Sequence, residues 1–202
     1  MPVTASTLSG LQAVYASLGG VGWTSNSGWM SANDPCSLAP NNWAGVTCNS
    51  AGSKIRSLYL GNSGVAGTLP TEVALVEFEA GDTNVGISAA SQTSLSGTLP
   101  TELGSLTTVQ TLDFFNTILS GTLPTELAQL TSLGLFRMHY SMISGTIPSW
   151  VGSDVASLTN FAWGGLSQAP WHGPLSGTLP TELGTLTKLS TLQMGQALLS
   201  GL

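Results

Sequence analysis

Charged residues are scarce in this sequence of 202 residues, and their scarcity excludes several classes of partner. Only 7% of the residues are Asp, Glu, Lys or Arg, and just four of them are Lys or Arg, which leaves a net charge of -6. A protein that binds nucleic acid or an anionic membrane surface needs clustered positive charge to neutralise phosphates. We therefore expect no nucleic acid partner.

The sequence also has no long apolar run and only two histidines. No apolar stretch approaches the roughly 18 residues of a membrane-spanning helix, and the initial MPVTASTLSG lacks the basic and apolar regions of a signal peptide. The sequence predicts a soluble chain that could begin after a removed leader. Its two histidines, His139 and His172, lie in no spacing typical of a catalytic triad or a metal site. We expect no enzyme, no cofactor and no metal.

The sequence has only two cysteines, Cys36 and Cys48, which are twelve residues apart. A disulfide between them would close a short loop, stabilise the protein by about 2–3 kcal/mol and indicate an oxidising compartment. Two free buried thiols in a reducing compartment are the other interpretation. The spacing by itself leaves both open.

What the sequence has in abundance is repetition. The motif [Ser/Ala]-Gly-Thr-[Leu/Ile]-Pro occurs five times, and its glycines are Gly67, Gly97, Gly121, Gly145 and Gly177. The basic spacing is 24 residues, and two longer spacings of 30 and 32 residues indicate insertions within 79–94 and 164–174. A fixed period of this length is typical of a solenoid built from stacked coils.

Each period also carries a regular apolar pattern. The apolar residues that follow Pro100 are Leu103, Leu106, Val109, Leu112 and Phe114. Offsets of three predict a tight helical arm, and the final offset of two predicts a short strand, so each coil turns one apolar edge inward for its neighbours to bury. At the start of the arm, we expect the hydroxyl of Thr101 to cap the helix and Glu102 to supply a favourable first-turn charge.

These motifs resemble the leucine-rich repeat family, in particular the 24-residue class with Leu-Ser-Gly-x-[Ile/Leu]-Pro that is common in plant receptor ectodomains. Residues 8–48 are similar to the N-terminal cap of that family: a helix through Leu8, Leu11, Val14 and Leu18 ends at Gly19, and the segments that follow contain Trp23, Trp29, Asp34-Pro35-Cys36 and Trp43-Ala44-Gly45-Val46-Thr47-Cys48.

The resemblance implies a right-handed α/β solenoid with a parallel β-sheet on the concave side and short helices or 3-10 turns on the convex side. Residues 1–53 would form the cap, and residues 54–202 would form about six repeats, the last of them truncated. The resemblance also implies a disulfide between Cys36 and Cys48 and a secreted, cell-surface or lumenal location.

The sequence departs from the family in two places. Four residues before the motif glycine, the family usually has an Asn whose amide bonds adjacent coils, whereas this chain has Ser63, Thr117, Ser141 and Ala197. Because hydroxyls replace only part of such a ladder, we expect coils that are less tightly tied. The sequence also stops at Leu202 inside a repeat, and we expect an apolar edge there that further chain or a neighbouring subunit covers.

Outward-facing side chains of the predicted concave strands are the first candidate for a functional surface. Aromatic and arginine groups are common anchors of protein interfaces. The partner-binding residues that we predict are Tyr59, Asp113, Phe115, Arg137, His139 and, from the second insertion, Trp171. Trp163 occupies a core position of the repeat, and we expect its side chain to fill space inside the second insertion.

Two periodic sets of polar residues are further candidates. A glutamate rank, Glu72, Glu102, Glu126 and Glu182, favours a solvated face over a calcium site, since one carboxylate per coil makes a poor oxygen cage. A threonine rank could present hydroxyls and methyls to ice, although strand propensity explains the same pattern; it consists of Thr68, Thr98, Thr122, Thr146 and Thr178.

The sequence therefore predicts a non-catalytic module that binds a protein or peptide through the concave face. The resemblance implies a receptor ectodomain or a secreted inhibitor of the kind that blocks polygalacturonases. A structural scaffold subunit of a larger lumenal or surface assembly, held through the C-terminal edge, is one alternative. Ice binding through the threonine rank is the second.

Overall fold

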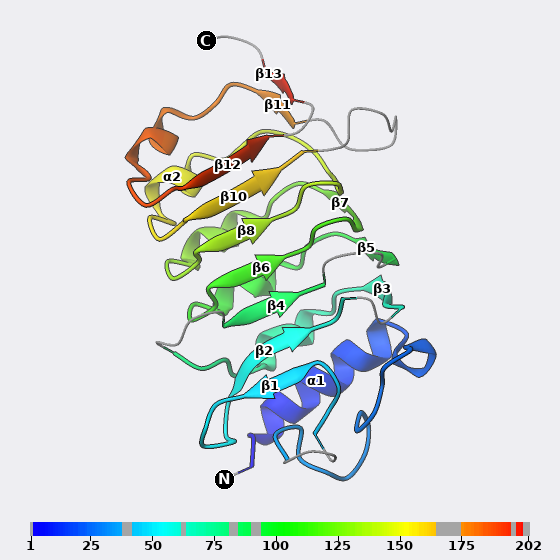
Figure 1. The fold of residues 1–202 in the computed structure, drawn as a ribbon. Coiled ribbons are helices and arrows are strands. Elements are labelled where there is room, and N and C mark those ends of the chain that lie inside the picture. Colours follow the sequence, from blue (N-terminus) through cyan, green and yellow to red (C-terminus); the bar gives the residue numbers. More distant parts are fainter. Residues whose placement is uncertain are drawn as a thin grey trace.

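The computed structural model describes residues 2–37, 42–61, 64–80, 85–89, 94–164, 175–194 and 197–199. Figure 1 shows the chain as a stack of coils that rises from the N-terminal helix α1 to the C-terminal strand β13. Short strands of successive coils lie side by side on one face, and the helical arms lie behind them (Figure 1). The predicted solenoid is therefore confirmed.

The N-terminal cap consists of helix α1 (Ala5–Ser17), the 3-10 turn η1 (Gly20–Gly22) and an irregular segment that is tied to the first coil. Helix α1 begins after Thr4, whose hydroxyl accepts from the Thr7 amide, and ends just before Gly19, which has φ 68°. Cys36 and Cys48 form a disulfide, so the bridge implied by the family resemblance is present. Four rings of the cap also pack against one another: those of Tyr15, Trp23, Trp29 and Trp43.

The concave sheet has seven strands, and every pair except β1 with β2 is parallel. In spatial order they are β1 (Val46–Cys48), β2 (Ile55–Tyr59), β4 (Gly86–Ser88), β6 (Thr111–Asp113), β8 (Leu135–Arg137), β10 (Asn160–Trp163) and β12 (Thr191–Met194). One residue of each of the middle five strands points inward and is fully buried, and these residues pair in register: Leu58, Ile87, Leu112, Phe136 and Phe161. This apolar column joins the coils into one core.

A second parallel sheet, which we call the lateral sheet, was not predicted from the sequence. Its four strands are β3 (Ala66–Thr68), β5 (Ser94–Gly97), β7 (Ile118–Gly121) and β9 (Met142–Ile143), and β11 (Leu175–Gly177) pairs separately with β13 (Ala197–Leu199). Every one of these strands except β13 contains or adjoins the repeated [Ser/Ala]-Gly-Thr, so the motif marks an additional row of backbone pairing between coils.

The repeated glycine and threonine contact each other across neighbouring coils. Gly121 has φ 85°, and a Cβ placed on it would lie 2.9 Å from the Thr98 methyl carbon of the coil below. A Cβ placed on Gly97, Gly145 or Gly177 would likewise lie 2.7 to 3.3 Å from the equivalent threonine methyl carbon. Only glycine combines a left-handed backbone with this close approach, which explains why the motif does not vary.

Serine hydroxyls provide bonds between coils that the sequence analysis did not count. Ser96 Oγ donates to the Gly67 carbonyl at 3.0 Å, and Ser120 Oγ donates to the Gly97 carbonyl at 3.2 Å. At the family's Asn position, by contrast, Thr117 donates to a carbonyl within its own coil. The cross-coil ladder therefore runs through the motif serine.

The convex side consists of one-turn helical arms. These are η2 (Thr71–Leu75), η3 (Thr101–Ser105), η4 (Thr125–Gln129), α2 (Trp150–Ser153) and η5 (Thr181–Thr185). The predicted threonine cap is wrong: Pro100 occupies the N-cap of η3 without a side-chain bond, and Thr101 Oγ1 donates instead to Glu102 Oε2 at 3.1 Å. Proline favours that extended N-cap backbone and shifts threonine into the first turn.

One interpretation of the insertions also needs correction. Strand β4 lies inside residues 79–94, so a concave strand occupies the middle of a stretch that the spacing indicated as an insertion. The coil that contains β4 thus contributes to the concave face like its neighbours.

The glycine contacts give a direct test of the coil packing. Gly121→Ala forces a side chain into a left-handed backbone against Thr98, and we expect a loss of about 1–3 kcal/mol in the free energy of unfolding. Gly184→Ala is the matched control, since a Cβ there meets nothing within 4 Å; it should change stability by less than about 1 kcal/mol. Urea unfolding measures both, and equal effects of the two variants would contradict the contact.

Candidate functional site

Two rows of outward-facing residues cross the middle of the concave sheet. The strand register places Tyr59 of β2, Ser88 of β4, Asp113 of β6 and Arg137 of β8 side by side in one row. The second row consists of Ser57, Gly86, Thr111 and Leu135. Because strands in a sheet are about 4.8 Å apart, each row extends for about 14 Å across the strands.

A shallow groove of about 230 Å³ follows these rows. Of the residues predicted from the sequence, Tyr59, Asp113 and Arg137 line this groove together. Sequence reasoning missed Gly86 and Ser88, which also line it, because β4 lies inside the presumed insertion. The alternation Val85-Gly86-Ile87-Ser88-Ala89, apolar at every second position, was the signal that could have located this strand.

Asp113 and Arg137 form an ion pair inside the groove. Arg137 Nη2 donates to Asp113 Oδ2, and the Phe115 amide donates to Asp113 Oδ1 at 3.3 Å. The side chain of Asp113 is only 5% exposed, against 37% for Arg137. A carboxylate this deeply buried depends on its partner, so the pair is a neutral unit in which the arginine side chain is the partly exposed member.

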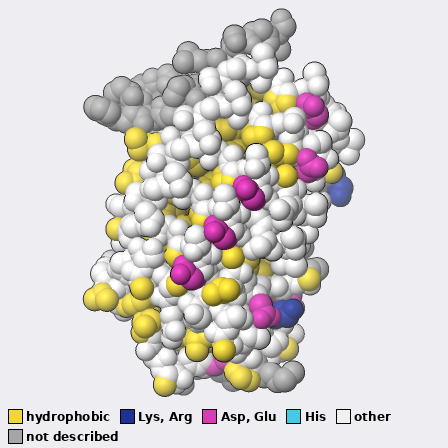
Figure 2. All heavy atoms as spheres, turned by 180° about the vertical axis from the view of Figure 1, so that it is seen from behind, with side chains coloured by type: hydrophobic (Ala, Val, Ile, Leu, Met, Phe, Trp, Pro, Cys, Tyr) yellow, Lys and Arg dark blue, Asp and Glu magenta, His cyan; other side chains and the backbone are white. Residues whose placement is uncertain are grey.

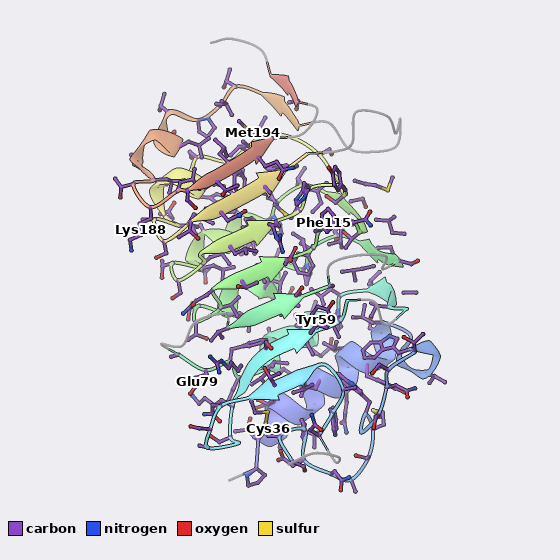
Figure 3. All side chains as sticks on the ribbon, viewed as in Figure 1. Cys36, Tyr59, Glu79, Phe115, Lys188 and Met194 are labelled. Atoms are coloured by element: carbon purple, nitrogen blue, oxygen red, sulfur yellow. A yellow bond between two sulfur atoms is a disulfide. The ribbon has the colours of Figure 1, made fainter. Side chains whose placement is uncertain are left out.

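Three rings form a cluster beside the pair, which we call the ring cluster: Phe115, His139 and Tyr140. Their centroids lie 4.5 to 5.3 Å apart. Tyr140 has φ 63°, an unusual backbone for an aromatic residue, and Asn116 takes the same conformation one coil below. Figure 3 shows Phe115 and Tyr59 at the end of the concave face where the strands terminate, opposite Glu79 and Lys188.

His139 is less accessible than the sequence analysis expected. The strand alternation predicted an outward contact residue, but the side chain is 9% exposed because the other two rings of the cluster pack against it. Burial lowers the pKa of His139, Arg137 lowers it further, and Asp113 opposes them by raising it. The imidazole is therefore held in its neutral form, and its Nδ1 has no hydrogen-bond partner.

The two predicted tryptophans of the second insertion have different outcomes. Trp163 is fully buried, and its Nε1 donates to the Ile143 carbonyl at 3.3 Å, so the expected core role is confirmed. Trp171 lies outside the described residues, as does His172.

The glutamate rank lies on the convex side, away from the groove. Each of its carboxylates accepts from the hydroxyl of the threonine that precedes it. Figure 2 shows acidic side chains in a diagonal row across the back of the molecule. Within the described part of the chain, no group of three or more His, Cys, Asp or Glu residues could hold a metal ion.

No protein-family model matches this sequence, and no curated protein matches it. Solved structures do match. The Arabidopsis receptor kinase HAESA, in complex with the peptide hormone IDA and the co-receptor SERK1, aligns over 98% of this chain with a TM-score of 0.76 and 24% identity. A chain of the BIR3–SERK2 complex from Arabidopsis thaliana has a TM-score of 0.71 and 25% identity over 95% of this chain. The ectodomain of SOBIR1 from Arabidopsis thaliana covers all of this chain, with a TM-score of 0.70 and 16% identity.

The chain has the leucine-rich repeat fold of these plant receptor ectodomains. The chain covers very different shares of these structures. The alignment spans 96% and 98% of the BIR3–SERK2 and SOBIR1 chains. It spans only 29–30% of the HAESA ectodomain structures and 18% of the GASSHO1/SCHENGEN3 ectodomain from Arabidopsis thaliana.

Two further features concern the described helices and the last strand of the concave sheet, β12. None of the described helices has the length and apolarity needed to cross a membrane. At the C-terminal side of the concave sheet, Leu192 occupies the inward phase of β12 but is 42% exposed, whereas the equivalent Phe161 is fully buried.

The buried histidine predicts a pH dependence of stability. The unfolded chain binds a proton at His139 near pH 6.5, while the folded protein binds it only at lower pH, so the free energy of unfolding should fall as pH drops below about 6.5. His139→Phe retains a ring but cannot titrate, and the decrease between pH 7 and pH 5 should be smaller in this variant. Urea unfolding at several pH values measures it; identical pH profiles for the two proteins would contradict the buried neutral imidazole.

Proposed function

We propose that this protein is a non-catalytic recognition module that binds an extended peptide, free or as part of a protein, across its concave face. The observation that carries the proposal is the groove that crosses four strands and is lined by Tyr59, Asp113 and Arg137. Tyr59 is 47% exposed, and an exposed aromatic beside a partly exposed arginine is a frequent anchor of protein interfaces.

The structural neighbours support binding as the role of this fold. HAESA was solved with a peptide hormone, and the GASSHO1/SCHENGEN3 ectodomain was solved with CASPARIAN STRIP INTEGRITY FACTOR 2. For this chain we infer a ligand of peptide character from its own groove, which offers hydroxyls and an arginine to backbone carbonyls. An extracellular or lumenal compartment goes with this role, because the disulfide between Cys36 and Cys48 persists in an oxidising environment.

The two alternative functions each rest on one observation. The scaffold role is supported by the exposed Leu192, an apolar surface that a neighbouring subunit could bury. Ice binding is supported by the threonine rank, whose members are all exposed along the edge of the lateral sheet. The glycine contacts already explain four of the five threonine methyls, however, so most of the rank has a structural reason that needs no ice.

Peptide display tests the proposed function. We expect the purified protein to enrich peptides from a random 12-residue library, with micromolar affinity in calorimetry. Replacing the four concave residues Tyr59, Asp113, Phe115 and Arg137 by alanine should weaken this binding at least about tenfold, since anchors of this kind contribute 2 kcal/mol or more. Alanine at Glu72, Glu102 and Glu126 is the convex control and should leave binding unchanged.

A library that yields no enriched peptide, or peptides that bind the fourfold concave variant as tightly as the original protein, would contradict the proposed function. Retained ice recrystallisation-inhibition activity after loss of peptide binding would favour the threonine rank instead. A protein that inhibits no recrystallisation at all excludes that alternative.

A further inference from the structure

The groove is hollow above Gly86, a position of β4 that has no side chain. Gly86 lies between Ser57 and Thr111 in its row, and a Cβ on Gly86 would lie 2.0 Å from the Thr111 carbonyl oxygen. Any other residue would force β4 and β6 apart, so this position remains without a side chain. The space above it extends from Tyr59 on β2 to Leu135 on β8.

The volume of the hollow limits what it can hold. Pockets for drug-sized molecules have volumes of about 300–1,000 Å³, whereas an apolar cavity of about 150 Å³ already admits a benzene ring. At about 230 Å³ the hollow has room for one side chain of leucine to phenylalanine size. A whole cofactor or a sugar chain would not be enclosed.

The walls of the hollow favour an apolar occupant. Its lining includes the exposed ring of Tyr59 and the partly exposed side chain of Leu135. Ser88 and Thr111 add hydroxyls to the same lining, and hydroxyls can bond the main chain of a peptide. A buried apolar side chain flanked by main-chain hydrogen bonds is the usual arrangement of a peptide anchor.

Charge at the Arg137 end argues against an anionic ligand group. Among the described residues that line the groove, only Asp113 and Arg137 are charged, and they already neutralise each other. A carboxylate that captured the guanidinium would leave the buried carboxylate of Asp113 without its partner, which is strongly unfavourable. A neutral acceptor such as a carbonyl oxygen can bond the exposed part of the guanidinium and keep the pair intact.

The geometry points to a selectivity pocket within the proposed peptide-binding site. The hollow above Gly86 takes one uncharged side chain of leucine to phenylalanine size, and Arg137 bonds a neutral carbonyl of the same peptide, not a free carboxylate. This inference rests on the proposed function and adds the chemical class of the ligand at its anchor position.

The experiment uses synthetic copies of the peptides that the display selection enriches. We expect them to share one position occupied by Leu, Ile, Met or Phe, and alanine at that position should weaken binding about 10- to 100-fold. Peptides with a C-terminal amide and with a free carboxylate should bind within about twofold of each other. The proposed contacts pair no charged group of the peptide with a charged group of the groove. Raising the salt concentration should therefore change the affinity by less than about twofold.

Variants that fill the hollow identify where the anchor binds. Leu135→Trp blocks it from β8 and Ser88→Leu blocks it from β4, and each should weaken binding at least about tenfold. Gln193→Trp, which adds the same bulk to the exposed surface of β12 outside the groove, is the matched control and should bind normally. Thermal unfolding of all three variants identifies any that fail to fold. The two filling variants are independent, so the peptide affinity of either one that folds is enough to test whether the anchor binds in the hollow.

The failures of the two proposals are distinguishable. Peptides that bind the concave face but lack an apolar position, require a free carboxylate or bind both filling variants normally would overturn the pocket while leaving the recognition function in place. A library without any enriched peptide overturns the recognition function and the pocket with it.

Discussion

Burial of one apolar column between stacked coils is the interaction on which the rest of this structure depends. No single coil can cover its inward side chains, and residues such as Leu112 and Phe136 become fully buried only because a coil lies on each side. Each such side chain contributes about 1.5–3 kcal/mol when it is removed from water. A chain with only 7% charged residues relies on this column, because surface ion pairs could contribute little.

Close stacking also explains the repeated motif and the placement of the site. The coils approach so closely that the motif glycine contacts the threonine methyl of the preceding coil, and the motif serine donates to its backbone. The same spacing places Tyr59, Asp113 and Arg137, which are far apart in sequence, in one row of the concave sheet. The candidate binding surface is therefore a consequence of the repeat, and its chemistry depends on which outward residues each coil carries.

The repeat made the solenoid, the concave sheet and the core predictable from sequence, because apolar spacing directly reflects which side of a coil is buried. The lateral sheet was not predictable in the same way: its strands pair through backbone atoms, and the glycine in each motif is a residue type that is depleted in strands. Strand β4 was missed because a change of spacing indicates an insertion without showing where the strand resumes. The burial of His139 depends on Phe115 from another coil, a contact that no local pattern encodes.

Hydrogen–deuterium exchange of the purified protein measures the stacking directly, since it reports how often each strand opens. Mutual burial predicts strong and similar protection in β4, β6 and β8, whose inward residues are covered on both sides, and faster exchange in β12, where Leu192 is 42% exposed. Unprotected amides in β4, β6 and β8, or protection in β12 equal to that of β6, would contradict a core built from neighbouring coils.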